Sequence, residues 1–444
     1  MFQNQLIPAS IYVNAGRVAA VTSFENIPPD CEILEAGEDS IVMPGLVDSH
    51  VHVNEPGRTE WEGFGTATRA AAAGGVTTIV DMPLNCIPAT TTVDALKAKL
   101  AAARGKLMVD TAFWGGVVPG NTAELAKLWD AGVVGFKCFL IHSGVDEFPN
   151  VTESDLREAM PELARLGAML IVHAEVPGPI DSACCQAPGD SADRSYETFL
   201  HSRPRAAENE AVELMIRLSR DTGCRIHIVH HSSADALAAL RAAKAAGAQL
   251  TVETCPHYLH FAAEDIPDGA TEFKCCPPIR ERANREQLWE ALRDGTIDMV
   301  VSDHSPCPPE MKVREQGDFM KAWGGISSLQ LRLPLMWTEA SARGFTVNQL
   351  AEWLCAAPAR QVGLAPAKGS ISVGGDADIV IWNPEREFLV APGLIQHRHK
   401  LTPYAGQTLR GVVEKTFLRG QMVYDGGEFG EPNGQLLFRA KLEI

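Results

Sequence analysis

Eight short apolar segments recur between residues 46 and 303, and helical stretches lie between most of them. The segments are Leu46–His52, Val76–Asp81, Met108–Gly115, Val133–Leu140, Met169–His173, Arg225–His230, Gln249–Thr254 and Asp298–Asp303. The clearest helical stretches are Trp61–Ala73, Val93–Ala103, Arg205–Arg220, Ser233–Ala246, Ile326–Arg343 and Val347–Ala356. Continuous apolar strands that alternate with helices predict a parallel sheet covered by helices on its outer face. Eight such units predict an α/β fold of the (β/α)8 TIM-barrel type.

The two ends of the chain have a different texture. The first 45 residues contain short β-prone pieces at Ser10–Asn14 and Arg17–Phe24, and Gly369–Trp382 begins a turn-rich, β-prone tail that continues to residue 444. We therefore expect a small β-sandwich domain formed by both chain ends, residues 1–45 and 369–444, around a barrel of residues 46–368.

The charge balance disfavours two classes of partner. Thirty-nine Lys and Arg residues against 56 Asp and Glu give a formal net charge of −17. Nucleic acids and anionic membranes need clustered positive charge, so we expect neither as a partner. The first residues show no secretory signal, and no apolar run is long enough to cross a membrane. The 11 cysteines, with adjacent pairs at Cys184–Cys185 and Cys275–Cys276, indicate a reduced, cytoplasmic protein rather than a disulfide framework.

Residues that bind metals fall at the carboxyl ends of the predicted strands, where barrel enzymes place their chemistry. The set consists of His50, His52, Lys137, His173, His230 and Asp303. Residues i and i+2 of a strand share a face, so His50 and His52 can both point into the barrel. A lone strand-end histidine is more often a hydrogen-bonded core residue, and a lysine in an apolar strand can extend its amine to solvent. The conjunction of six such residues indicates a metal site.

Lys137 is unusual in this set because an ammonium repels cations. Burial favours the neutral amine, and addition of CO2 to that amine gives a carbamate with two anionic oxygens. Such a group can bridge two metals as a carboxylate does.

Several motifs resemble the cyclic amidohydrolases, a family that includes dihydroorotases, hydantoinases, dihydropyrimidinases and allantoinases. The motifs are MPGLVDSHVH at Met43–His52, GFK at Gly135–Lys137, IVHAE at Ile171–Glu175, HHSS at His230–Ser233, TCPH at Thr254–His257 and SDHSP at Ser302–Pro306. The resemblance runs from about Met43 to Trp382. It implies a barrel with a β-sandwich, and two divalent metals bridged by a carboxylated lysine and a hydroxide. The metals are usually zinc, and these ligands also suit cobalt, manganese or iron.

The resemblance also implies a role for each ligand. His50, His52 and Asp303 would bind the more buried metal, His173 and His230 the other, and carboxylated Lys137 would bridge them. The family's His-x-Ser-Ser pattern selects His230 over the adjacent His231. The two cations would lower the pKa of the bridging water, and Asp303 would pass the proton of the hydroxide to the leaving nitrogen.

The position two residues after the His-x-His segment bears on the substrate. Dihydroorotases carry an arginine there to grip a carboxylate, whereas this chain has Asn54, which suits a neutral ring with N–H and C=O groups. Asp81–Asn85 (DMPLN), Gly135–Leu140 and Gly317–Ser328 are similar to allantoinases. The resemblance therefore implies hydrolysis of a small cyclic ureide, allantoin, to allantoate. A hydantoinase or dihydropyrimidinase with the same site is the alternative. A non-catalytic scaffold is disfavoured because all six ligand positions are filled.

Four further residues are candidates for substrate contact beside Asn54. Asn85 follows the second strand, although a turn-forming asparagine is the plainer interpretation. His142 stands where hydantoinase-like relatives have an oxyanion-binding tyrosine. By family analogy, backbone near Cys276 and Gly325 would bind the ring amide. Relatives are often dimers or tetramers, so we expect a homo-oligomer.

Overall fold

Eight parallel strand positions close into a barrel in the computed structural model, which describes residues 6–25, 27, 30–184 and 193–439. The strands are β4 (Leu46–Val51), β5 (Val76–Asp81), β6 (Asp110–Phe113) with β7 (Gly115–Gly116), β8 (Phe136–Phe139), β9 (Met169–His173), β10 (Arg225–Ile228), β11 (Leu250–Thr254) and β12 (Met299–Val300). Neighbours in this order pair in parallel. Only Trp114 separates β6 from β7, so the two form one barrel position. A parallel bridge from Val51 to His304 closes the ring.

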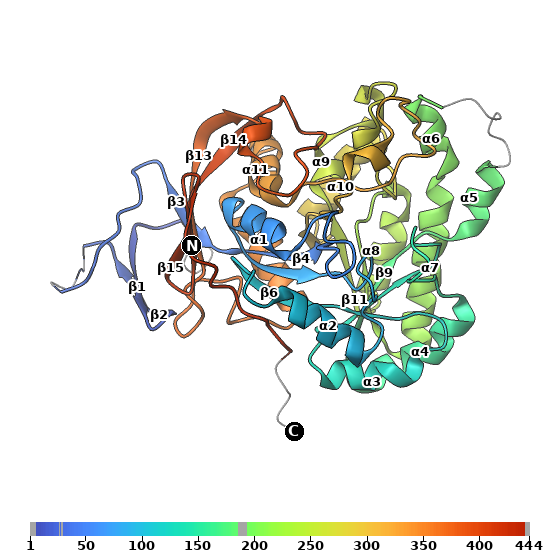
Figure 1. The fold of residues 1–444 in the computed structure, drawn as a ribbon, viewed down its shortest axis with the longest axis horizontal. Helices are drawn as coiled ribbons and strands as arrows, with labels where there is room; N and C mark the ends of the chain where they lie inside the picture. Colours follow the sequence, from blue (N-terminus) through green and yellow to red (C-terminus); the bar gives the residue numbers. More distant parts are fainter. Residues whose placement is uncertain (1–5, 26, 28–29, 185–192, 440–444) are drawn as a thin grey trace.

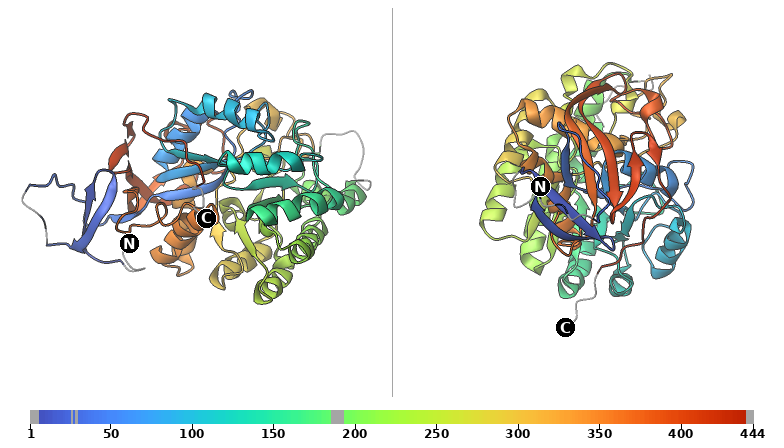
Figure 2. Two further views of the ribbon diagram at one scale, coloured as in Figure 1. Left: turned by 90° about the horizontal axis from the view of Figure 1, so that it is seen from below. Right: turned by 90° about the vertical axis from the view of Figure 1, so that its left-hand side faces the viewer.

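Helices surround the barrel, as Figures 1 and 2 show. They are α1 (Phe64–Ala73), α2 (Val93–Ala103), α3 (Thr122–Asp130), α4 (Glu153–Leu166), α5 (Pro177–Cys184), α6 (Tyr196–Ser202), α7 (Arg205–Thr222), α8 (Leu237–Ala245), α9 (Pro256–His260), α10 (Arg282–Arg293), α11 (Arg332–Ala342), α12 (Val347–Ala351) and α13 (Ala357–Gln361). Helix α4 has clear boundary signals, because Thr152 and Asp155 form a capping box and Gly167 ends the helix in a left-handed conformation. A π-helical turn, Glu352–Ala356, joins α12 to α13.

Both chain ends contribute to a second, antiparallel region at one end of the molecule (Figures 1 and 2). A five-stranded sheet has the order β16 (Glu428–Phe429), β15 (Gln421–Asp425), β14 (Thr408–Leu418), β13 (Ile379–Leu389) and β3 (Ile41–Pro44). A hairpin, β1 (Ala9–Asn14) with β2 (Arg17–Ser23), meets this region through a small apolar core that includes Val18, Ile371 and Ala377. Only Gly45 separates β3 from barrel strand β4, so the first functional strand continues from this sheet.

The predicted fold class is confirmed, a barrel with a β region built from both chain ends, while the domain limits at 45 and 369 stay a prediction. Some predicted boundaries are wrong. Helix α1 begins at Phe64 rather than Trp61, because Gly63 has a non-helical φ of 103° and the Glu55 carboxylate accepts a hydrogen bond from the Phe64 N–H. The last barrel strand is only Met299–Val300, since the backbone at Asp303 has φ 42° and has left the extended conformation.

The cysteines and the helices can each be compared with the sequence. Nine cysteines of the described residues are free thiols, and eight of these nine are buried or half-buried. Cys185 and the Cys184 side chain lie outside the described residues. Among the helices that the structure describes, none combines the length and apolar character needed to cross a bilayer.

Candidate metal centre

Five of the six predicted ligands lie at or just beyond the carboxyl ends of barrel strands, Lys137 lies within a strand, and all six are buried. His50 lies in β4 and His52 follows it, Lys137 lies in β8, and His173 is the last residue of β9. His230 and Asp303 come after β10 and β12 with φ values of 37° and 42°. Left-handed backbone is uncommon for residues other than glycine, and such local strain often accompanies functional sites.

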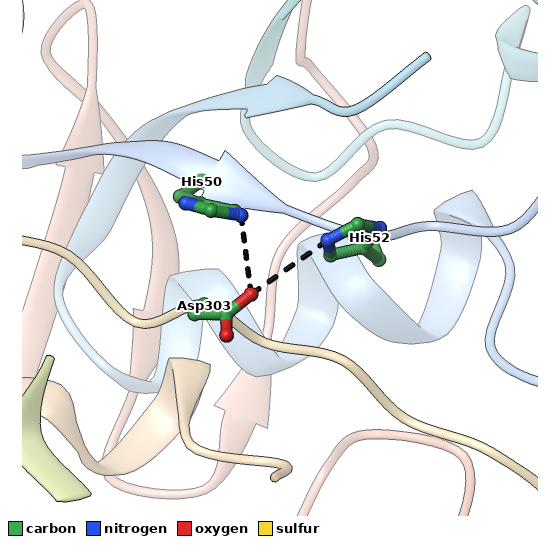
Figure 3. A group of neighbouring side chains, drawn as sticks. All are labelled: His50, His52 and Asp303. Atoms are coloured by element: carbon green, nitrogen blue, oxygen red, sulfur yellow. Dashed lines mark ion pairs between the residues drawn. The ribbon is translucent and has the colours of Figure 1, made fainter. Parts of the chain in front are cut away.

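His50, His52 and Asp303 form a compact group in which both rings face one carboxylate (Figure 3). The Nε2 atom of His50 lies 3.1 Å from Oδ1 of Asp303, and Nε2 of His52 lies 3.6 Å from the same oxygen. Ser305 donates a hydrogen bond to this oxygen at 2.8 Å. The three ligand atoms lie within 4.8 Å of one another, so one cation can contact all three.

His173 and His230 form a second pair beside the first. Their facing nitrogens, Nδ1 of His173 and Nε2 of His230, are 2.9 Å apart. The His230 ring centroid lies 5.4 Å from that of His50, which joins the two pairs into one cluster. Phe139 stacks on His173 with the ring centroids 4.6 Å apart, and Nζ of Lys137 lies 5.0 Å from the centroid of Phe139. The structure thus brings the four histidines, the lysine and the aspartate to one rim.

The amine of Lys137 is the most unusual group of the cluster. Its side chain is fully buried, and Nζ has no hydrogen-bond partner in the part of the chain that the structure describes. Burial lowers the pKa of Lys137 from 10.5 to about 8, against the opposing charges of Glu253 and Asp303. A buried lysine without a partner is costly as a cation, so the environment favours the neutral amine that can add CO2.

Burial favours the neutral, cation-binding form of three of these histidines, His52, His173 and His230. Burial lowers the pKa of His52 and His230 well below 6.5, and neighbouring cationic groups add to the effect. Burial also lowers the pKa of His173, although its hydrogen bond to Glu175 opposes that change. A neutral imidazole keeps a lone pair for a metal. Burial raises the pKa of Asp303, so this carboxylate gains strongly from a cation beside it.

Two buried glutamates orient the histidines from outside the cluster, and the sequence analysis assigned neither a role. Glu253 in β11 lies 2.5 Å from Nδ1 of His50 and 2.9 Å from Nε2 of His227. Glu175 lies 2.8 Å from Nε2 of His173 and receives a hydrogen bond from Arg203. Carboxylates in these positions fix the tautomer of a ligating histidine. Both carried a signal, since Glu253 interrupts an apolar strand and Glu175 ends the IVHAE motif.

The predicted substrate residues fall into two groups. Asn54 and Asn85 are buried near the cluster, and each has a side-chain carbonyl oxygen without a partner among the described residues. His142 is on the surface, with 59% of its side chain exposed, and its Nδ1 accepts a hydrogen bond from the Gly144 N–H.

The two backbone candidates, near Cys276 and Gly325, lie in segments that contact each other. A side chain at Gly324, the residue before Gly325, would approach the sulfur of half-buried Cys276 to 3.1 Å. The N–H of Gly325 already donates to the Lys274 carbonyl at 2.8 Å, so it is not available to a ring amide in this conformation. A side chain at Gly325 would collide with the Ser305 carbonyl, which explains the glycine.

Two other groups of potential ligands occur in the described residues. Cys255 and His257 lie within reach of Asp303, at the edge of the same centre. Asp110, Asp376 and Asp378 form the other group, and Lys368 supplies the positive charge there, with its Nζ 2.6, 2.9 and 2.7 Å from the three carboxylates. Of these groups in the described residues, the strand-end cluster alone combines several buried histidines with an unpartnered buried amine, so its residues fit a pair of divalent cations.

Comparisons with known proteins agree with this geometry. The model of the Amidohydrolase family matches residues 41–423, and the chain belongs to that family. It is similar to the allantoinase of Streptomyces avermitilis, with 52% identity over 97% of this chain and 95% of that protein. The allantoinase of Saccharomyces cerevisiae is 47% identical over 95% of this chain and 89% of that protein.

Solved structures show the same architecture. The L-hydantoinase (dihydropyrimidinase) of Arthrobacter aurescens superposes with a TM-score of 0.89 and 34% identity, covering 97% of this chain and 96% of that one. The dihydropyrimidinase of Brevibacillus agri gives a TM-score of 0.88 at 27% identity, covering 98% and 96%.

Proposed function

We propose that this enzyme hydrolyses the hydantoin ring of allantoin to allantoate. The observation that carries the proposal is similarity over nearly the whole chain to proteins named allantoinase, which extends to organisms as distant as a bacterium and a yeast. The geometry supports the same reaction class, because a buried cluster of histidines with one carboxylate can hold the metal ions that activate water for hydrolysis of a cyclic amide.

The residues present would hold two divalent ions. His50, His52 and Asp303 would hold one ion, His173 and His230 the other, and carboxylated Lys137 would bridge them. Zinc suits these ligands, as do cobalt, manganese and iron. When bound, the ions supply a hydroxide nucleophile near neutral pH and polarise the substrate carbonyl.

Asp303 is the group placed to move a proton. It lies between His50 and His52 at the rim, and Ser305 fixes its orientation. Burial raises the pKa of Asp303 in the absence of a cation, and a carboxylate at this position can accept a proton. We assign it the transfer of a proton from the nucleophile to the departing ring nitrogen.

Substrate recognition falls to neutral groups. Asn54 donates its amide N–H to the Pro306 carbonyl at 3.3 Å, and its own buried carbonyl oxygen is left for a substrate N–H. A neutral asparagine favours an uncharged ureide over an anionic ring. The exposed position of His142 argues against it as the oxyanion donor in this conformation.

The test is a comparison of kcat/KM for allantoin, hydantoin and dihydrouracil on one purified sample whose metal content is measured. We expect allantoin to be preferred strongly. A preference for hydantoin or dihydrouracil would favour the alternative, a hydantoinase or dihydropyrimidinase, which the superposed structures keep open. We also propose that the enzyme is a cytoplasmic homo-oligomer, a dimer or tetramer, which native mass measurement tests.

A further inference from the structure

Lys312 is buried between two loops of the barrel, and its ammonium group contacts the backbone of both. It ends the short 3-10 helix Pro309–Lys312, in the connection that follows β12. Nζ donates hydrogen bonds to the carbonyls of Trp323 at 2.9 Å and Gly325 at 2.5 Å in the same connection. It also donates to the carbonyl of Lys274 at 3.2 Å, in the segment between α9 and α10. An ammonium has three N–H donors, so each donor has one carbonyl acceptor.

The loop that carries Gly325 lies against the metal centre. A side chain at Gly325 would collide with the carbonyl of Ser305, and the Ile326 carbonyl accepts a hydrogen bond from the Ser305 N–H at 3.0 Å. The Ser305 hydroxyl in turn donates to Oδ1 of Asp303, the carboxylate drawn in Figure 3. Ser305 alone therefore separates the backbone held by Lys312 from a predicted metal ligand.

Two backbone N–H groups beside these carbonyls, those of Gly324 and Cys276, have no acceptor among the described residues. A Cβ atom at Gly324 would lie 3.7 Å from the backbone nitrogen of Cys276, so the two groups are close together, and both residues are half-buried. The Trp323 carbonyl and the Gly324 N–H belong to one planar trans peptide and point in opposite directions. By binding that carbonyl, Lys312 fixes the direction of the Gly324 N–H.

We propose that Lys312 is a positioning residue for the substrate, which holds the backbone of residues 274–276 and 323–325 in the arrangement that binds the ring amide. The inference rests on the proposed function, hydrolysis of a cyclic ureide. The carbonyl oxygens of such a ring need N–H donors, and the backbone of Gly324 and Cys276 supplies two that no protein group uses. Lys312 itself contacts neither the substrate nor the metals in this role.

A lysine buried against carbonyls also stabilises the fold, so the experiment has to separate position from stability. Loss of the ammonium leaves buried carbonyls without a donor, which costs free energy of folding. If Lys312 only stabilises the protein, the molecules that remain folded bind substrate normally. If Lys312 positions the two loops, folded and metal-loaded enzyme binds substrate poorly, because the N–H groups are displaced.

The experiment compares metal-loaded wild type with Lys312→Met, which keeps the length of the side chain without a donor, and Lys312→Gln, which keeps two N–H donors on a shorter side chain. Lys368→Met is the matched control, because Lys368 is similarly buried but contacts carboxylates, including that of Asp110 at the start of β6. The measurements are metal content, kcat and KM for allantoin and hydantoin, and amide hydrogen exchange of residues 319–331 without substrate.

We expect Lys312→Met to keep both metals and to lose about 100-fold in kcat/KM, mainly through a higher KM, the order of effect of a displaced binding contact. Lys312→Gln should fall between Lys312→Met and wild type. Hydrogen exchange of residues 319–331 should be faster in Lys312→Met. Lys368→Met should show wild-type exchange in this segment and a wild-type KM.

A wild-type KM in folded, metal-loaded Lys312→Met overturns the inference, and so does loss of the metals together with activity. If Lys312→Met does not fold, the same outcomes for Lys312→Gln decide. A wild type that prefers hydantoin refutes the proposed substrate, and the KM for hydantoin then tests Lys312. A wild type that hydrolyses neither ring refutes the proposed function, and unchanged hydrogen exchange of residues 319–331 in Lys312→Met would separately refute the positioning role.

Discussion

Two buried lysines lie at opposite ends of the barrel and have opposite surroundings. Lys137, near the carboxyl ends of the strands, has no hydrogen-bond partner among the described residues, and burial lowers its pKa to about 8. Lys368 contacts Asp110, the first residue of β6, together with Asp376 and Asp378. Burial disfavours its charge as well, but Asp378 and Asp110 outweigh burial and raise the pKa of Lys368 above 10.5. Partners, rather than burial, decide which lysine keeps its proton.

The difference matches the division of work in such barrels, where the carboxyl end carries chemistry and the amino end carries stability. The cluster at the amino end binds the barrel to the sheet made by the chain ends, because Asp378 precedes β13 and Arg419, which follows β14, pairs with Asp110. The charges there are balanced within the protein. At the carboxyl end, the charged groups are available to bind cations and substrate.

The largest expected effect comes from Lys137→Met, which keeps the volume of the side chain but removes the amine. We expect activity to fall about 10⁴-fold or more, because the bridge between the metals and the charge stabilisation of the transition state are both lost. Metal content should fall, while the free energy of unfolding of the metal-free protein should be unchanged or higher. The assay is allantoin turnover with metal analysis on the same sample. Near-wild-type activity would show that Lys137 is not a bridge.

Lys368→Met is the matched change at the other end. We expect it to cost about 3–5 kcal/mol in the free energy of unfolding, because buried Asp378 loses its cation, while Asp110 and half-buried Asp376 each keep only an arginine. Urea unfolding measures this. The folded fraction should still bind two metals and turn over substrate normally. Loss of metal from folded protein would contradict the separation of the two ends.

The local parts of this arrangement could be predicted from the sequence. The limits of β5, β9 and α2 match their predicted ranges, because each is set by a pattern within the segment itself. His173 could be placed at a strand end for the same reason. Residues that lie beyond the end of a strand were harder to place from the sequence, because the backbone at His230 and Asp303 turns out of the sheet with positive φ.

Contacts between distant segments could not be predicted. Glu253 meets His50 across 203 residues of sequence, and Lys368 meets Asp110 across 258. Nothing in the neighbourhood of either residue in sequence reveals its partner, since the barrel closes only when all strands are in register. The contact of Asn85 could not be predicted either, because the local sequence indicates only a turn and the fold alone brings His52 to the Asn85 side chain.

The smallest expected effect is a dependence of stability on pH that differs between the two lysines. The experiment uses metal-free protein in buffer without CO2, and compares the free energy of unfolding of wild type and Lys137→Met between pH 8 and 10.5. In the unfolded chain Lys137 keeps its proton up to about its ordinary pKa of 10.5, whereas in the folded chain it loses the proton from about pH 8. The unfolded state therefore binds more protons in this interval, and stability rises with pH.

We expect wild type to gain on the order of 3 kcal/mol relative to Lys137→Met across this interval, at 1.36 kcal/mol for each pH unit. The difference between wild type and Lys368→Met should stay flat there. The pKa of Lys368 is raised, so its stabilisation is complete below 10.5 and is lost only at higher pH. If the difference in the free energy of unfolding between wild type and Lys137→Met is flat or falls with pH, the amine of Lys137 has a partner in solution. The contrast between Lys137 and Lys368 would then be wrong for Lys137.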